Sequence, residues 1–153
     1  MTTEEDVVKA VSDLSESGAV SERVALHSLG IGPNDAKVLR FLLDREESGE
    51  QVTPRLLAEM LRISSAATTA LIDRLADAGW VDRVPFPGDR RSIVVRATIA
   101  QDSPARHLLA VRRSSVAEAA SRLGAAERRV VADFLDEVAR AETQRVEHLQ
   151  SRD

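Results

Sequence analysis

The chain has 153 residues, the usual length of one domain with a short appendage for contact with a partner. Its 21 basic and 25 acidic side chains give a formal net charge of −4, which argues against a uniformly cationic nucleic-acid binder. It has no cysteine, which excludes disulfides, thiolate metal sites and a cysteine nucleophile. Neither a signal-peptide pattern nor a long apolar run is present, so we expect a cytoplasmic protein with no membrane segment.

Charge is distributed unevenly along the chain. Residues 1–52 hold 5 basic against 11 acidic side chains, residues 53–100 hold 7 against 5, and residues 101–153 hold 9 of each. Nineteen of the basic residues are arginine, which suits phosphate and base edges, although a GC-rich genome would also encode arginine in place of lysine. Any contact with nucleic acid is therefore expected from the middle segment.

The N-terminal segment has the pattern of two helices. Apolar residues at helical spacing predict a helix over residues 4–29, with a weak point at Gly18. A second helix is expected to begin at Pro33, after Gly32 as a permissive cap, and to end near Gly49. The first segment is thus predicted to be entirely helical apart from a short break.

The middle segment predicts two short helices followed by a hairpin. Thr53 can cap a helix whose first residue is proline, and Ser64 can cap a second helix that ends at Gly79. Residues 80–84 alternate like a strand, residues 92–99 are rich in β-branched side chains, and a loop with proline and glycine joins them.

The last segment is predicted to be helical again. Pro104 opens a helix that Gly124 breaks, and a final helix over residues 125–149 carries an apolar seam at alternating three- and four-residue steps. That spacing is typical of a helix that packs against another helix.

The order of short helix, tight turn, second helix, strand, basic loop and strand is that of a winged helix–turn–helix. In that arrangement the second helix enters the major groove, and the hairpin tip follows the adjacent backbone or minor groove. The expected DNA contacts are Ser64, Ser65, Ala66, Thr68, Thr69 and Arg74 on the recognition helix, Thr53, Arg55 and Arg62 at the backbone, and Asp89, Arg90 and Arg91 on the wing.

The recognition helix is expected to present small side chains to DNA. Hydroxyls can bond either donors or acceptors on base edges, and methyl groups can contact thymine, but such a face discriminates only modestly between bases. The alternative is that these residues merely continue an alanine-rich helix and that the arginines are ordinary solvated side chains.

Two motifs resemble those of the MarR family of bacterial transcriptional regulators, in a region from residue 29 to 98. The family's wing motif, Asp-x-Arg, five residues, Leu-Thr, corresponds to residues 89–98. The ending of its recognition helix corresponds to residues 71–75, followed by Gly79 and Val81.

The resemblance implies roles for individual residues. Arg91 looks like the wing arginine that enters the minor groove, Asp89 like the acid that holds the wing in shape, and Thr69 with its neighbours would face bases. The chain departs from the family pattern at Ala97, where leucine is usual, and at Ala70, where many members carry arginine. These departures leave the operator sequence open.

Both terminal segments carry apolar faces that we expect to form a homodimer. A two-fold dimer places two recognition helices about one turn of DNA apart and gains affinity for a palindrome. The resemblance to the MarR family also implies dimerisation through both termini. The expected interface residues are Val7, Val11, Leu14, Val131, Phe134 and Val138. The alternative is that these faces fold back within one monomer.

No catalytic residue, cofactor or metal site is expected. The three histidines lie far apart and lack metal-ligand spacing, although His27 and His107 could meet across folded helices. The chain has no phosphate-binding loop and no nucleophile motif. The resemblance implies a small-molecule effector as a candidate partner, which the sequence does not identify.

The expected fold class is mainly α with a small β-hairpin wing, combining a winged helix–turn–helix DNA-binding lobe with a helical dimerisation lobe built from both termini. The expected divisions are residues 1–31 for the N-terminal dimerisation helix, 32–100 for the DNA-binding lobe and 101–153 for the C-terminal dimerisation helices. The predicted function is a transcriptional regulator, a repressor, that binds a palindromic promoter site in double-stranded DNA as a homodimer and is released by a small molecule. The alternative is a winged-helix module for protein–protein assembly; an enzyme is not expected.

Overall fold

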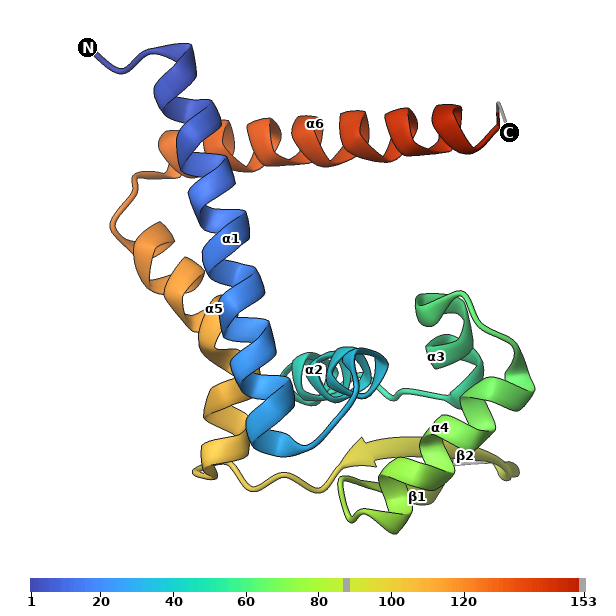
Figure 1. Cartoon of the computed structure of the whole chain (residues 1–153). Helices are drawn as coiled ribbons and strands as arrows, with labels where there is room; N and C mark the ends of the chain where they lie inside the picture. The colour runs from blue at the N-terminus through green and yellow to red at the C-terminus, as the bar shows by residue number, and fades with distance from the viewer. Residues whose placement is uncertain (87–88, 152–153) are drawn as a thin grey trace. The chain divides into compact units, whose positions relative to one another are not determined.

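The computed structural model describes residues 1–86 and 89–151, with the backbone alone at residues 89–91. Over this part of the chain it contains six helices and one antiparallel hairpin (Figure 1). The elements are α1 (Glu4–Leu29), α2 (Pro33–Ser48), α3 (Pro54–Leu61), α4 (Ser65–Asp77), β1 (Val81–Phe86), β2 (Asp89–Ala97), α5 (Pro104–Ser121) and α6 (Ala125–Gln150). The predicted mainly helical fold with a hairpin is confirmed.

The chain divides into two compact units, Met1–Arg112 and Arg113–Asp153. The boundary lies inside α5, so the first unit holds α1 to α4, the hairpin and the start of α5. The second unit holds the end of α5 and α6. The functional division into residues 1–31, 32–100 and 101–153 stays a prediction.

The helix ends follow from local chemistry. The hydroxyl of Thr53 accepts a hydrogen bond from the backbone N–H of Leu56 at 3.3 Å, and that of Ser64 accepts from Ala67 at 3.2 Å, so both predicted caps are confirmed. α1 runs without interruption through Gly18. The weak point expected there is not a break.

The core of the first unit is built around α2. Five of its apolar residues are buried, and they pack with buried side chains from α3, α4, both strands and the start of α5. The largest fully buried residues include Leu39, Leu57, Ile72 and Leu75. Truncation of either Leu39 or Leu57 to alanine would cost about 2–5 kcal/mol, because each would leave a cavity.

The hairpin is held to the helices through this core. β1 and β2 pair from Val81 opposite Ala97 to Pro85 opposite Ile93, and the register shifts between Pro85 and Phe86. The backbone N–H of Val95 also donates to the carbonyl of Val52 at 2.8 Å, so the segment between α2 and α3 forms a bridge to β2. Within this unit α2 packs on β2 and α4 packs on β1 (Figure 1).

Two arginines join the helices of the first unit. Arg40 on α2 donates to the carbonyl of Leu109 on α5 at 3.0 Å and pairs with Glu22 on α1 at 2.5 Å. Arg106 on α5 is buried, and it pairs with Glu46 on α2 at 2.9 Å. In the part of the chain that is described, no helix is both long and apolar enough to cross a membrane.

Candidate nucleic-acid interface

The turn between α3 and α4 is made by three residues, Arg62, Ile63 and Ser64. Arg62 adopts the left-handed conformation, with φ 55° and ψ 43°, and its N–H caps the carbonyl end of α3. Ile63 donates to the carbonyl of Ala58 at 3.2 Å, which closes the turn. Arg62, whose side chain is exposed, therefore lies at the start of the turn, two residues before the N-cap of α4.

α4 has one buried and one exposed face. Leu71, Ile72 and Leu75 are buried in the core, while the exposed residues in the N-terminal half of the helix are small. The exposed small residues near its N-terminus are Ser65, Ala66, Ala67, Thr69 and Ala70. Because none of these residues has a long side chain, another molecule can approach this part of the helix backbone closely.

Thr68 does not belong to the exposed face. It is 1% exposed, and its hydroxyl donates to the carbonyl of Ser64 at 2.9 Å. The expectation that Thr68 contacts DNA is therefore wrong, because the residue lies on the core side of α4. Thr69 is exposed, and its hydroxyl donates to the carbonyl of Ser65 at 3.0 Å, which leaves its oxygen able to accept a bond.

Arg55 on α3 is almost fully exposed. Its Nε donates to Glu59 at 2.9 Å, and this hydrogen bond together with the charge of Glu59 raises the pKa of Arg55. The pair is one helical turn apart and contributes little to stability. A guanidinium has five N–H donors, so Arg55 keeps donors for a phosphate oxygen.

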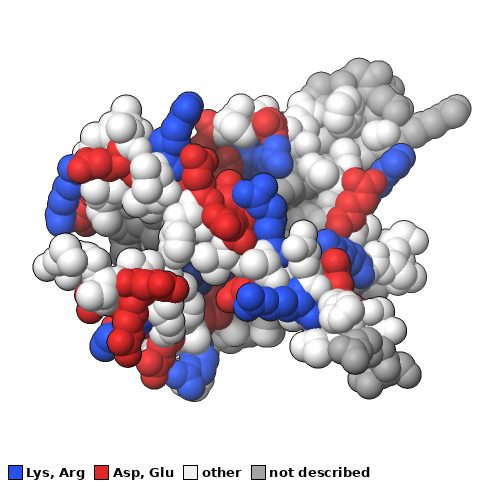
Figure 2. All heavy atoms as spheres, turned by 90° about the horizontal axis from the view of Figure 1, so that it is seen from above, with Lys and Arg blue, Asp and Glu red and all other residues white. Residues whose placement is uncertain are grey.

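Basic and acidic side chains are interspersed on the face presented in Figure 2. The segment of residues 53–100 carries only 7 basic against 5 acidic side chains, so a contact with DNA through it would depend on individual arginines rather than on a continuous basic surface. Such a protein is expected to bind nonspecific duplex weakly, because nonspecific affinity comes from neutralised phosphates.

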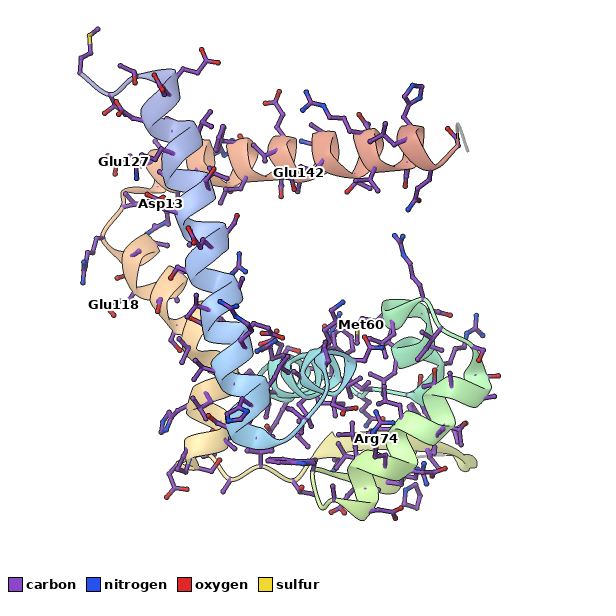
Figure 3. All side chains as sticks on the ribbon, in the orientation of Figure 1. Asp13, Met60, Arg74, Glu118, Glu127 and Glu142 are labelled. Atoms are coloured by element: carbon purple, nitrogen blue, oxygen red, sulfur yellow. The ribbon has the colours of Figure 1, made fainter. Side chains whose placement is uncertain are left out.

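Arg74 lies on α4, where Figure 3 labels it, and it has an internal partner that the sequence did not indicate. Its Nη2 lies 2.5 Å from Oδ1 of Asp35, the third residue of α2. The neighbouring residue on α4, Asp73, pairs with Arg83 on β1. Two consecutive side chains of the recognition helix are therefore bound to two different elements.

The wing predictions fall largely outside the described residues. The backbone of Asp89 pairs with Phe86 at the end of the hairpin. The side chains of Asp89, Arg90 and Arg91 lie outside what the structure describes, as do Pro87 and Gly88. Their roles stay predictions.

The predicted dimer residues lie on helices of both units. On α1, Val7 and Val11 are half-buried and Leu14 is 43% exposed. On α6, Val131 is 44% and Phe134 38% exposed, and Val138 is half-buried. Each helix by itself thus carries apolar side chains that remain accessible for a partner.

No group of three or more potential metal ligands occurs among the described residues. His27 and His107 are both exposed. A cavity of about 250 Å³ lies between the end of α2 and β2, with Leu42, Val52 and Val94 among its lining residues. It is smaller than the ~300–1,000 Å³ of usual ligand sites.

The helix–turn–helix with a hairpin is shared with known regulators. Residues 29–92 match the MarR family model. This match spans the end of α1 to the start of β2, so the predicted resemblance to the MarR family is confirmed.

Relatives with curated names match parts of the chain. The multiple antibiotic resistance protein MarR of Escherichia coli (strain K12) is 40% identical over 47 residues, which are 31% of this chain and 33% of MarR. The uncharacterized HTH-type transcriptional regulator YcgE of Bacillus subtilis (strain 168) is 33% identical over 92 residues, 60% of this chain and 57% of YcgE. The matched part spans about a third of MarR and just over half of YcgE.

Two solved structures resemble the chain over most of its length. A mutant of S. aureus MepR bound to an oligodeoxyribonucleotide has a TM-score of 0.57 and 15% identity, covering 92% of this chain and 99% of MepR. A MarR family protein from Bacillus stearothermophilus has a TM-score of 0.56 and 20% identity, covering 94% and 99%. At these identities the likeness is one of fold, and it confirms the predicted winged-helix class.

Proposed function

We propose that the chain is a transcriptional regulator that reads double-stranded DNA with α4. The observation that carries this proposal is the N-terminal half of α4, whose exposed residues are small and which begins three residues after the exposed Arg62. An α-helix fits the major groove, and small side chains let its backbone approach base edges and phosphates. The contact set that we propose on this face is Ser64, Ser65, Ala66 and Thr69, with Thr53, Arg55 and Arg62 at the phosphates and Asp89, Arg90 and Arg91 on the wing.

The MarR-family region supports this proposal. It covers α2, α3 and α4 in full, the elements that form and hold the helix–turn–helix. The MepR structure of the same fold was solved with an oligodeoxyribonucleotide. Because a chromosomal operator lies in the cytoplasm, the proposal also places the protein there.

The protein is proposed to act as a homodimer on a palindrome. One recognition helix reaches a single half-site, so a second copy is needed to engage both halves, ~10 bp apart or a multiple of that. Val131 and Phe134 on α6 and Leu14 on α1 are accessible apolar residues that a second copy would cover. The palindrome is proposed to overlap a promoter, so that the bound dimer represses transcription. Binding of a small molecule is proposed to release the dimer from DNA.

The salt dependence of binding tests the DNA contact. A duplex is first enriched from a random pool by the purified protein, and its affinity is then measured over a series of salt concentrations. Arg55→Ala is expected to reduce the slope of log K against log salt by ~0.9, the contribution of one phosphate contact.

Arg122→Ala is the matched control. Arg122 is also exposed and pairs with a glutamate one turn earlier, Glu118, at 2.6 Å, but it lies just after α5. Its replacement is expected to leave the slope unchanged. Enrichment of no duplex at all would contradict the proposed function and favour a module for protein–protein assembly.

A further inference from the structure

We propose that Arg74 is a positioning residue, which orients α4 by pairing with the buried carboxylate of Asp35 and makes no contact with DNA. The inference rests on the proposed function, because it concerns how the recognition helix is held for binding. It replaces the sequence-based expectation that Arg74 is a DNA contact.

Asp35 is the buried partner of the pair. It is 6% exposed, and both of its carboxylate oxygens are used. Oδ2 accepts the backbone N–H of Gly32 at 3.0 Å, and Oδ1 accepts from Arg74 at 2.5 Å. A buried carboxylate is stable only when it is hydrogen-bonded and paired, so Asp35 holds Arg74 in place.

The Arg74–Asp35 pair restricts the orientation of α4 through a directional contact, which apolar packing alone does not provide. Leu71, Ile72 and Leu75 bind α4 to the core by apolar contact, a driving force that is itself non-directional. The ion pair from Arg74 to the start of α2 fixes the position of one side chain in three dimensions. The adjacent Asp73 makes the corresponding contact to Arg83 on the hairpin.

These two contacts have opposite polarity and come from consecutive residues. α4 supplies a cation to α2 through Arg74 and an anion to β1 through Asp73. Any rotation of α4 about its axis would strain both contacts. The exposed small face of α4 is thereby held at one angle relative to the rest of the first unit.

The two possible roles of Arg74, positioning α4 or contacting DNA, predict opposite changes in DNA affinity when the Asp35 carboxylate is replaced. If Arg74 bound a phosphate, Asp35 would compete with DNA for its guanidinium, and Asp35→Asn would strengthen binding. If Arg74 positions α4, Asp35→Asn weakens binding as much as Arg74→Gln does. Asparagine keeps an oxygen for the N–H of Gly32, so the helix cap survives the change.

The test is a double-mutant cycle on the enriched duplex. We expect Asp35→Asn and Arg74→Gln each to lower the affinity by about tenfold, and the double variant to be no weaker than either single one, because the two residues form one contact. The salt slope is expected to stay at the wild-type value in all three. Tighter binding by Asp35→Asn, or a slope reduced by ~0.9 in Arg74→Gln, would overturn the inference.

Arg40→Gln controls for a general loss of stability. It removes the pair with Glu22 at a site away from α4, so it is expected to lower the unfolding temperature without weakening DNA binding. An equal loss of affinity in Arg40→Gln would mean that Arg74 acts through stability alone, and would also overturn the inference.

Amide hydrogen exchange measured without DNA tests the positioning role of Arg74 independently of whether the protein binds DNA. Arg74 is 60% exposed, so Arg74→Gln is expected to fold. Faster exchange in α4 of this variant supports positioning, even if the wild-type protein binds no duplex. Unchanged exchange in α4 contradicts it.

Discussion

Arg62 combines a strained backbone conformation with a proposed contact to a DNA phosphate. Its φ of 55° lies in the left-handed region, where a residue with a Cβ atom is strained by about 1–2 kcal/mol. Among the side chains that the structure describes, none pairs with its guanidinium, so no contact of that kind offsets the strain. Backbone strain of this sort is often kept where function requires the side chain.

Arg62→Gly removes the strain and the charge together. Glycine loses about 0.5–1 kcal/mol more conformational entropy on folding than other residues, so a net stabilisation of about 0.5–1 kcal/mol is expected. The same change removes a proposed phosphate contact. Affinity for the enriched duplex is expected to fall by roughly tenfold, and the salt slope by ~0.9.

Arg62→Ala separates the two effects. Alanine keeps a Cβ atom in the left-handed region, so the free energy of unfolding should stay near the wild-type value while the proposed phosphate contact is lost. Urea unfolding of the three proteins and fluorescence anisotropy over a salt series measure both quantities. The reasoning is refuted if glycine destabilises the fold or if neither variant changes the salt slope.

Three further changes test other parts of the account. Gly18→Ala is expected to stabilise α1 by about 0.5–1 kcal/mol in urea unfolding, because the added Cβ would meet only the flexible end of an arginine side chain; a destabilised protein would contradict this. The pKa of Asp6 is lowered by hydrogen bonds from Thr3, so the first turn of α1 should lose this stabilisation as the pH falls through that lowered pKa. Asp6→Asn should abolish the pH dependence of the amide protection factors there, that is, of exchange rates divided by the intrinsic rates at each pH. Phe134→Glu should give a monomer in sedimentation, whereas Val146→Glu, on the same helix but off the apolar seam, should leave a dimer; a dimeric Phe134→Glu would contradict the proposed interface.

The helices and the hairpin could be predicted because their signals are local. Thr53 and Ser64 cap the helices that follow them, and proline marks the first position of three helices. Gly18 was the exception, since glycine weakens a helix in general but a helix of 26 residues continues through it.

The site was less predictable, for two different reasons. Thr68 is spaced three, four and seven residues from Leu71, Ile72 and Leu75, which places it on the buried face by helical periodicity. Its hydroxyl suggested a contact with DNA, although the spacing already indicated the core. The pair of Asp35 with Arg74 joins residues 39 positions apart and has no local signal, so only the folded chain reveals it.

The sequences that the purified protein enriches from random duplexes test the central claim most directly. DNA reading by α4 in a homodimer predicts a palindrome whose half-sites are centred ~10 bp apart or a multiple of that. A second selection from the same random duplexes with the Phe134→Glu variant, which is expected to be a monomer, should enrich no palindrome. A pool that stays random with the wild-type protein would contradict the claim.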